Sequence, residues 1–139
     1  MLQRRHRVLR VRHVQHALAV VETARAQEEA DGIARNAERL KNVRASLFEG
    51  DGVSMGGSFA AYRELATRLE QAGRQLDGAL YDARRKLDEK QGRRVEANRE
   101  REIAERLRDR IRAALDAHVE AKIAALPRYR KMQMREGDS

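Results

Sequence analysis

One cluster of helix-breaking residues divides a chain that is otherwise suited to long helices. Residues 50–58 read Gly-Asp-Gly-Val-Ser-Met-Gly-Gly-Ser, and the sequence contains a single proline, Pro127. Each glycine destabilises a helix by roughly 1 kcal/mol relative to alanine. We therefore expect one helix to stop before this cluster and a second helix to start after it.

Apolar residues before the cluster recur at steps of three and four, which is the spacing of one helix face. This pattern predicts a first helix over about residues 5–48 and a turn over 49–57. The residues that form the predicted face are Val11, Val14, Leu18, Val21, Ile33, Ala37, Leu40, Val43 and Leu47.

After the cluster, Ser58 is a plausible N-cap for a second helix over about residues 58–126, followed by a basic tail over 127–139. Pro127 is expected to end this helix. Its first part has the a/d spacing of a coiled coil, its middle is polar at Lys90 and Arg93, and its end is apolar again. The first apolar run is Tyr62, Leu65, Leu69, Ala72, Leu76, Ala79 and Ala83, and the last is Ile103, Leu107, Ile111, Leu115, Val119, Ile123 and Leu126.

These patterns predict an all-α fold, in which residues 1–139 form a single antiparallel coiled-coil hairpin whose second helix is longer than the first. Only 4% of the residues are aromatic and 37% are charged, which favours a thin seam between helices over a thick core. Folding about Val53 places Leu40 opposite Ala66 and Val11 opposite Val95. The second helix then continues past the first from about residue 104, with an apolar stripe that needs a partner.

Two motifs resemble parts of catalytic or metal sites, but the other residues or elements that such sites need are missing. The G-x-S-x-G pattern around Ser54 has no preceding strand, so a turn is the better interpretation. His13 and His16 lie one helical turn apart, but no carboxylate or third ligand is near them in the sequence. There is no cysteine and no phosphate-binding glycine loop. We expect no enzymatic activity, catalytic residue, metal, cofactor or small-molecule substrate.

Positive charge is concentrated at the two ends of the chain, whose formal net charge is +8. The hairpin would bring both ends together, where they could contact a protein, nucleic-acid phosphates or anionic lipid. Acidic pairs such as Glu28-Glu29 and few aromatic side chains disfavour nucleic acid. No apolar run reaches the ~18 residues of a membrane span, and we expect a cytoplasmic location. The basic groups are Arg4, Arg5, Arg7, Arg10 and Arg12, and Lys122, Arg128, Arg130, Lys131 and Arg135.

Two segments of the second helix resemble the flagellar export protein family FliJ, and the type III secretion stalk proteins of the YscO type are similar. The segments are SFAAYRELATRLEQA at residues 58–72 and REREIAERLRDR at 99–110. Chain length, basic charge and the glycine-rich turn agree with the family, and the resemblance extends over about residues 45–126. The chain departs from the family at Ala124-Ala125, where an acidic pair is common.

The resemblance implies a stalk or adaptor of the flagellar type III export apparatus, cytoplasmic and peripherally associated with the inner membrane. It implies a hexameric export ATPase, a membrane-embedded export gate and export chaperones as partners. The implied gate-binding residues are Tyr62, Leu65, Leu69, Ala72 and Leu76, although a plain seam between the helices explains the same pattern. The implied ATPase-binding residues are Arg4, Arg5, Arg7, Leu107, Ile111, Leu115 and Val119.

Two other functions compete with the stalk. One is a basic coiled-coil protein that binds nucleic acid or an anionic membrane surface, and the other is a scaffold that only dimerises.

Overall fold

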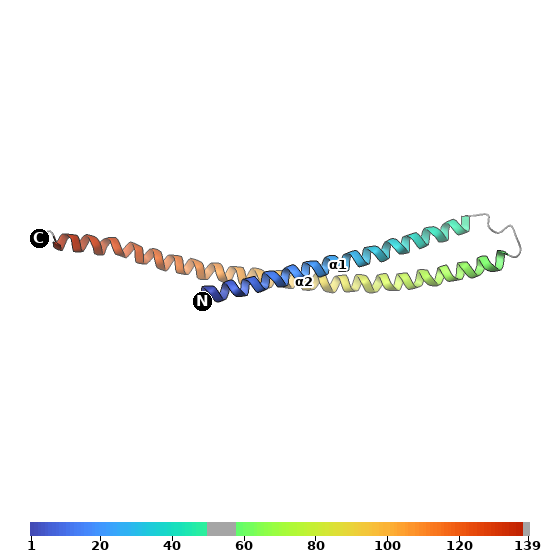
Figure 1. The fold of residues 1–139 in the computed structure, drawn as a ribbon, viewed down its shortest axis with the longest axis horizontal. Coiled ribbons are helices and arrows are strands. Elements are labelled where there is room, and N and C mark those ends of the chain that lie inside the picture. Colours follow the sequence, from blue (N-terminus) through green and yellow to red (C-terminus); the bar gives the residue numbers. More distant parts are fainter. Residues whose placement is uncertain (50–57, 138–139) are drawn as a thin grey trace. The chain divides into compact units, whose positions relative to one another are not determined.

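The chain is all-helical in the part that the computed structural model describes, which is the backbone of residues 1–49 and 58–137 and the side chains of 1–47 and 59–126. Helix α1 spans Leu2–Glu49 and helix α2 spans Ser58–Gly137 (Figure 1). These described residues include no strand, and no helix among them is long and apolar enough to cross a membrane. Residues 50–57 of the predicted turn, with Ser54, lie outside the described residues.

The helix ends near the glycine cluster lie close to the predicted ones, whereas the outer ends differ. Helix α1 begins at Leu2 rather than near residue 5, and α2 continues through Pro127 to Gly137. Proline removes one N–H and so frees the carbonyl of the residue four positions before it, Ile123. Ile123 is exposed, so water can satisfy that carbonyl. The expectation that Pro127 ends the helix was therefore wrong.

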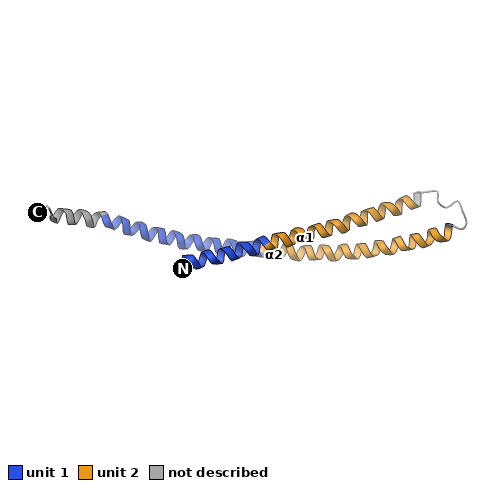
Figure 2. Cartoon of the chain, viewed as in Figure 1, with its two compact units in different colours: residues 1–17, 96–139 blue, residues 18–95 orange. Residues whose placement is uncertain are grey.

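The two helices pack against each other within two compact units (Figure 2). Unit 1 comprises residues 1–17 and 96–139, and unit 2 comprises residues 18–95. Each unit contains one segment of α1 and one segment of α2.

The seam of unit 2 alternates steps of three and four along both helices. Its most buried side chains are small or medium in size: Thr23, Ala26, Ala30, Ala83 and Leu87. This spacing keeps one face of each helix against the other. The buried and half-buried seam residues are Ala19, Thr23, Ala26, Ala30, Ile33, Ala37, Leu40, Arg44 and Leu47 on α1, and Tyr62, Ala66, Leu69, Gly73, Leu76, Leu80, Ala83, Leu87 and Lys90 on α2.

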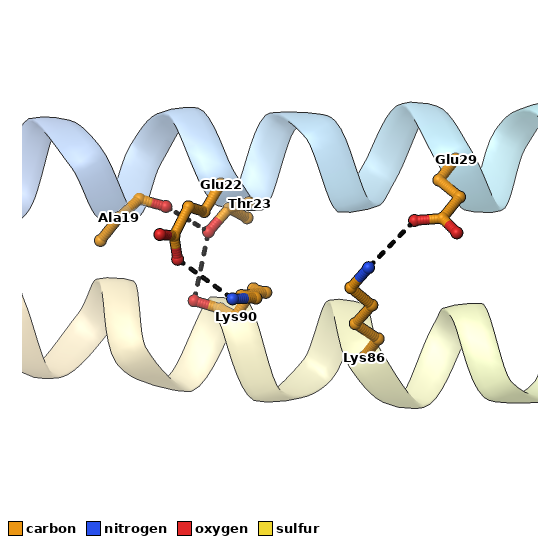
Figure 3. Close-up of polar contacts among 6 residues, drawn as sticks. All are labelled: Ala19, Glu22, Thr23, Glu29, Lys86 and Lys90. Atoms are coloured by element: carbon orange, nitrogen blue, oxygen red, sulfur yellow. Dashed lines mark hydrogen bonds and ion pairs between the residues drawn. The ribbon is translucent and has the colours of Figure 1, made fainter.

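Polar contacts bridge the middle of this seam (Figure 3). The Thr23 Oγ1 lies 2.7 Å from the carbonyl oxygen of Ala19 and 3.1 Å from that of Lys90. The hydroxyl can therefore donate its single proton to either carbonyl. Lys90 Nζ lies 3.1 Å from Glu22 Oε2. A second ion pair joins Lys86 Nζ to Glu29 Oε2 at 3.3 Å. Exposed pairs of this kind contribute about 0–1 kcal/mol each, so they favour one register more than they add stability.

Contacts in unit 2 run in opposite order along the two helices, but in a different register from the predicted one. Leu40 lies against Gly73 rather than Ala66, and Leu47 accepts a hydrogen bond from Tyr62. Helical side chains lean toward the N-terminus of their own helix. In helices of opposite direction the two leans add, so each α1 residue meets an α2 residue farther from the turn.

The predicted face of the first half of α1 was wrong. In unit 1, Val11 and Val14 are exposed, and in unit 2, Leu18 and Val21 are exposed. The reason is the phase of the seam. From Ile33, steps of three and four toward the N-terminus reach alanines and Thr23 and bypass these larger residues. Val43 in α1, and Leu65 and Ala79 in α2, are exposed for the same reason.

The seam predicts different costs for the same substitution at two leucines of α1. Leu9 is 3% exposed and Leu18 is 58% exposed. We expect Leu9→Ala to lower the free energy of unfolding by about 2 kcal/mol or more, because it leaves a cavity. Leu18→Ala should change it by less than about 0.5 kcal/mol. Urea unfolding followed by circular dichroism measures both, and a larger loss at Leu18 would contradict this seam.

Candidate partner-binding surfaces

In unit 1 the start of α1 packs on α2 around one leucine and one alanine. Leu9 and Ala104 are buried, and Arg12 Nη1 donates to Glu100 Oε2 at 2.6 Å. The predicted register placed Val11 opposite Val95, so here too the observed partner lies farther along α2. The neighbouring seam positions Arg5 and Arg108 are half-buried. Arginine stems can cover apolar surface while their charged ends stay in water, so this seam needs few apolar residues.

Beyond this seam α2 has no covering helix. Every described residue from Arg112 to Leu126 is exposed, and α2 continues past the start of α1 in unit 1 (Figure 1). The stretch carries four large apolar side chains at steps of three or four. They are Leu115 at 44% exposure, Val119 at 51%, Ile123 at 58% and Leu126 at 55%.

The residues expected to bind an ATPase all fall in unit 1, but they differ in exposure. Leu107 and Ile111 are half-buried, whereas Leu115 and Val119 are exposed. Arg4 and Arg7 are exposed and Arg5 is half-buried. Within the described part of the chain, none of these three arginines forms an ion pair.

The residues expected to bind an export gate lie in unit 2, mostly at the seam. Tyr62, Leu69, Ala72 and Leu76 are half-buried. The hydroxyl of Tyr62 donates to the carbonyl oxygen of Leu47 at 3.2 Å. Leu65 is the exception, because it is exposed beside the seam. The structure therefore gives most of this set a structural role and leaves Leu65 accessible.

A groove beside Gly73 in unit 2 has no counterpart in the sequence predictions. It has a volume of about 560 Å³, its floor includes Ala37, Leu40, Leu69 and Leu80, and charged residues form its rim. A glycine and alanines at seam positions leave space that larger side chains would fill. The signal in the sequence was Gly73 within a heptad pattern, but its partner helix face could not be assigned from the sequence.

Histidine and acidic side chains do not gather into a metal site within the described residues, where no three of them come together. His13 is exposed and His16 is half-buried at the seam of unit 1.

No protein-family model matches the chain, and neither the curated proteins nor the solved structures include a significant match.

The groove predicts that Gly73 can be replaced by alanine. A Cβ at position 73 would lie 3.8 Å from Leu40 Cδ2, an ordinary contact, and one at Gly78 would meet nothing within 4 Å. Because alanine favours helix more than glycine, we expect Gly73→Ala and Gly78→Ala each to raise the free energy of unfolding by about 0.5–1 kcal/mol. Chemical unfolding measures both, and a gain at 78 with a loss at 73 would contradict the observed packing.

Proposed function

We propose that this chain is a stalk or adaptor of a flagellar-type protein export apparatus, with the two helices paired as an antiparallel coiled-coil hairpin whose second helix is the longer. The observation that carries the proposal is the uncovered stretch of α2 from Arg112 to Leu126. In this function, the stretch inserts into a hexameric export ATPase and the part near the turn contacts an export gate.

Three features support the hairpin. Seam residues alternate steps of three and four in both helices, contacts in unit 2 run in opposite order along α1 and α2, and the helices contain 48 and 80 residues. This spacing is typical of coiled coils. A hairpin with one longer helix is the architecture that the FliJ resemblance implies.

The apolar character of the uncovered stretch supports the ATPase as partner. Burying a side chain such as Leu115 contributes roughly 1.5–3 kcal/mol, so an interface that covers several of these residues gains considerable stability. From Leu107 to Ile123 the apolar residues are four apart, so the stripe drifts around the helix. That drift suits a shaped surface better than a long left-handed coiled coil.

Exposed positive charges in unit 1 support docking onto an acidic protein surface. Arg4 and Arg7 are exposed and unpaired within the described residues. Such charges steer association with an acidic rim and add specificity. The proposal gives ATP hydrolysis to the partner and only binding to this chain.

The accessible residue near the turn supports a second contact with the export gate. Leu65 is exposed, whereas its predicted companions are half-buried. An adaptor of this kind also binds export chaperones and works at the cytoplasmic side of the inner membrane, which are further parts of the proposal.

The ATPase contact is tested with charged substitutions at exposed positions. We expect Leu115→Glu/Val119→Glu to abolish both complex formation with a hexameric export ATPase from the same source and any stimulation of ATP turnover. The change buries two unpaired charges at the interface, and it leaves the melting temperature unchanged because both residues are exposed. Size-exclusion chromatography with light scattering and an ATP turnover assay measure the effects.

The matched control is Val95→Glu, which adds a charge at another exposed valine of α2. It should bind and stimulate as the unchanged chain does. If the unchanged chain forms no complex, or if the double variant still binds, the ATPase contact is refuted.

The gate contact is tested at Leu65. We expect Leu65→Glu to weaken binding to the cytoplasmic part of the export gate by about tenfold or more, with unchanged helicity, because one central apolar contact is replaced by a buried charge. Biolayer interferometry measures the affinity. Equal affinities of the variant and the unchanged chain would show that Leu65 is not part of a gate contact.

A further inference from the structure

The face of α1 that points away from α2 in unit 1 carries a second apolar strip. Val11 is 55% exposed and Val14 is 58% exposed. They follow the seam residues Leu9 and Arg12 by two positions each, which is about 200° around a helix. The strip is therefore on the side of α1 opposite its seam, where no described residue covers it.

A shallow depression of about 470 Å³ marks this strip on the surface. Its boundary is formed by Arg7, Arg10, Val11, Val14 and Gln15. Val11 and Val14 are its apolar residues, and Arg7, Arg10 and Gln15 are its polar ones. The uncovered stretch of α2 used for the proposed ATPase contact contributes none of these residues.

The rim of the depression is held in place from the seam. Arg12 Nη1 donates to Glu100 Oε2 at 2.6 Å and to Gln15 Oε1 at 3.0 Å. Gln15 is therefore tied, through Arg12, to the contact that fixes α1 on α2. The two valines sit one turn apart on the same rigid helix.

The charge around the strip is entirely positive. Arg4, Arg7 and Arg10 are exposed, and within the described residues none of them forms an ion pair. The first acidic residue of the chain is Glu22. Like charges on one helix face repel each other, so a ligand that brings negative charge to both edges of the strip is favoured.

The spacing of the residues along the strip indicates that this ligand is a helix. Arg4, Arg7, Val11 and Val14 follow steps of three, four and three, which is the same rhythm as the α1 seam. Such a row fits the ridge of another helix. Phosphates of a nucleic acid gain nothing from valines, and the row has no aromatic side chain to anchor it in a bilayer interface.

We infer that this face of α1 binds an acidic amphipathic helix of a partner protein. The helix lies along the strip as a third helix on unit 1, its apolar side chains on Val11 and Val14 and its carboxylates beside Arg7 and Arg10. This interaction goes beyond the proposed function, because its apolar contacts lie at Val11 and Val14 of α1 and not on the uncovered stretch of α2, although Arg4 and Arg7 belong to both surfaces. It requires neither the export ATPase nor the gate.

The test uses the full chain and a synthetic, fluorescein-labelled helix of about three heptads, with leucine at positions a and d and glutamate at e and g. We expect the fluorescence anisotropy of this probe to rise on titration with the chain. A probe with lysine at e and g should not bind. Salt at about 500 mM should weaken binding of the acidic probe, because it screens exposed charges.

Two double variants assign the site. Val11→Ser/Val14→Ser should weaken binding of the acidic probe by about tenfold or more, because it removes the apolar floor. Arg7→Gln/Arg10→Gln should weaken binding and reduce its salt dependence. The control Val20→Ser/Val95→Ser changes two other exposed valines and should bind as the unchanged chain does. Circular dichroism should show equal helicity for all of them.

Several results would overturn the inference. One is an acidic probe that does not bind at about 100 μM in low salt, where a single helix contact of this size is detectable. Another is equal binding by the Val11→Ser/Val14→Ser variant. Binding to phosphatidylglycerol vesicles or to duplex DNA in place of the acidic probe would assign the face to a membrane or to nucleic acid. A dimer that dissociates on Val11→Ser/Val14→Ser would assign it to a second copy of the chain.

Discussion

A thin seam of side chains at alternating steps of three and four holds the two helices together, and the rest of the structure depends on it. The most buried positions of the seam are mainly alanines, together with Leu9 and Leu87, while other leucines such as Leu40 and Leu80 are half-buried beside them. Each alanine buries little apolar area, so stability comes from many repeats of the same contact along long helices. Thr23 is the buried polar residue of this seam, and its hydroxyl is hydrogen-bonded.

Because the steps of three and four bypass them, several large apolar residues lie outside the seam. In unit 1 they form two separate surfaces, one on α1 at Val11 and Val14 and one on α2 at Leu115 and beyond. Exposed apolar residues in helical rows are typical of surfaces that bind partners. We therefore place the proposed partner contacts on these helix faces, where arginines lie beside the exposed apolar residues.

The sequence was sufficient to predict the two helices, but it was insufficient to predict which face of each helix forms the seam. The glycine cluster predicted where α1 ends and α2 begins, and the stripe with Leu115 and Val119 was expected to lack a covering helix. The face with Val11 and Val14 was assigned to the seam because large apolar residues dominate a periodicity count. The phase of a long seam is instead set by the whole helix, and register depends on the lean of side chains and on space such as that at Gly73. Neither is visible in local spacing.

Measuring the register of the seam tests this account most directly, because the register decides which residues are exposed and can contact partners. The chain has no cysteine, so a pair of introduced cysteines reports one contact without background. Under mild oxidation, Leu40→Cys/Gly73→Cys should form an intramolecular disulfide faster than Leu40→Cys/Ala66→Cys, seen as a mobility shift in a non-reducing gel, because the side chain of Leu40 lies beside position 73. Disulfide formation by the 40/66 pair and not by the 40/73 pair would contradict the seam and the surfaces derived from it.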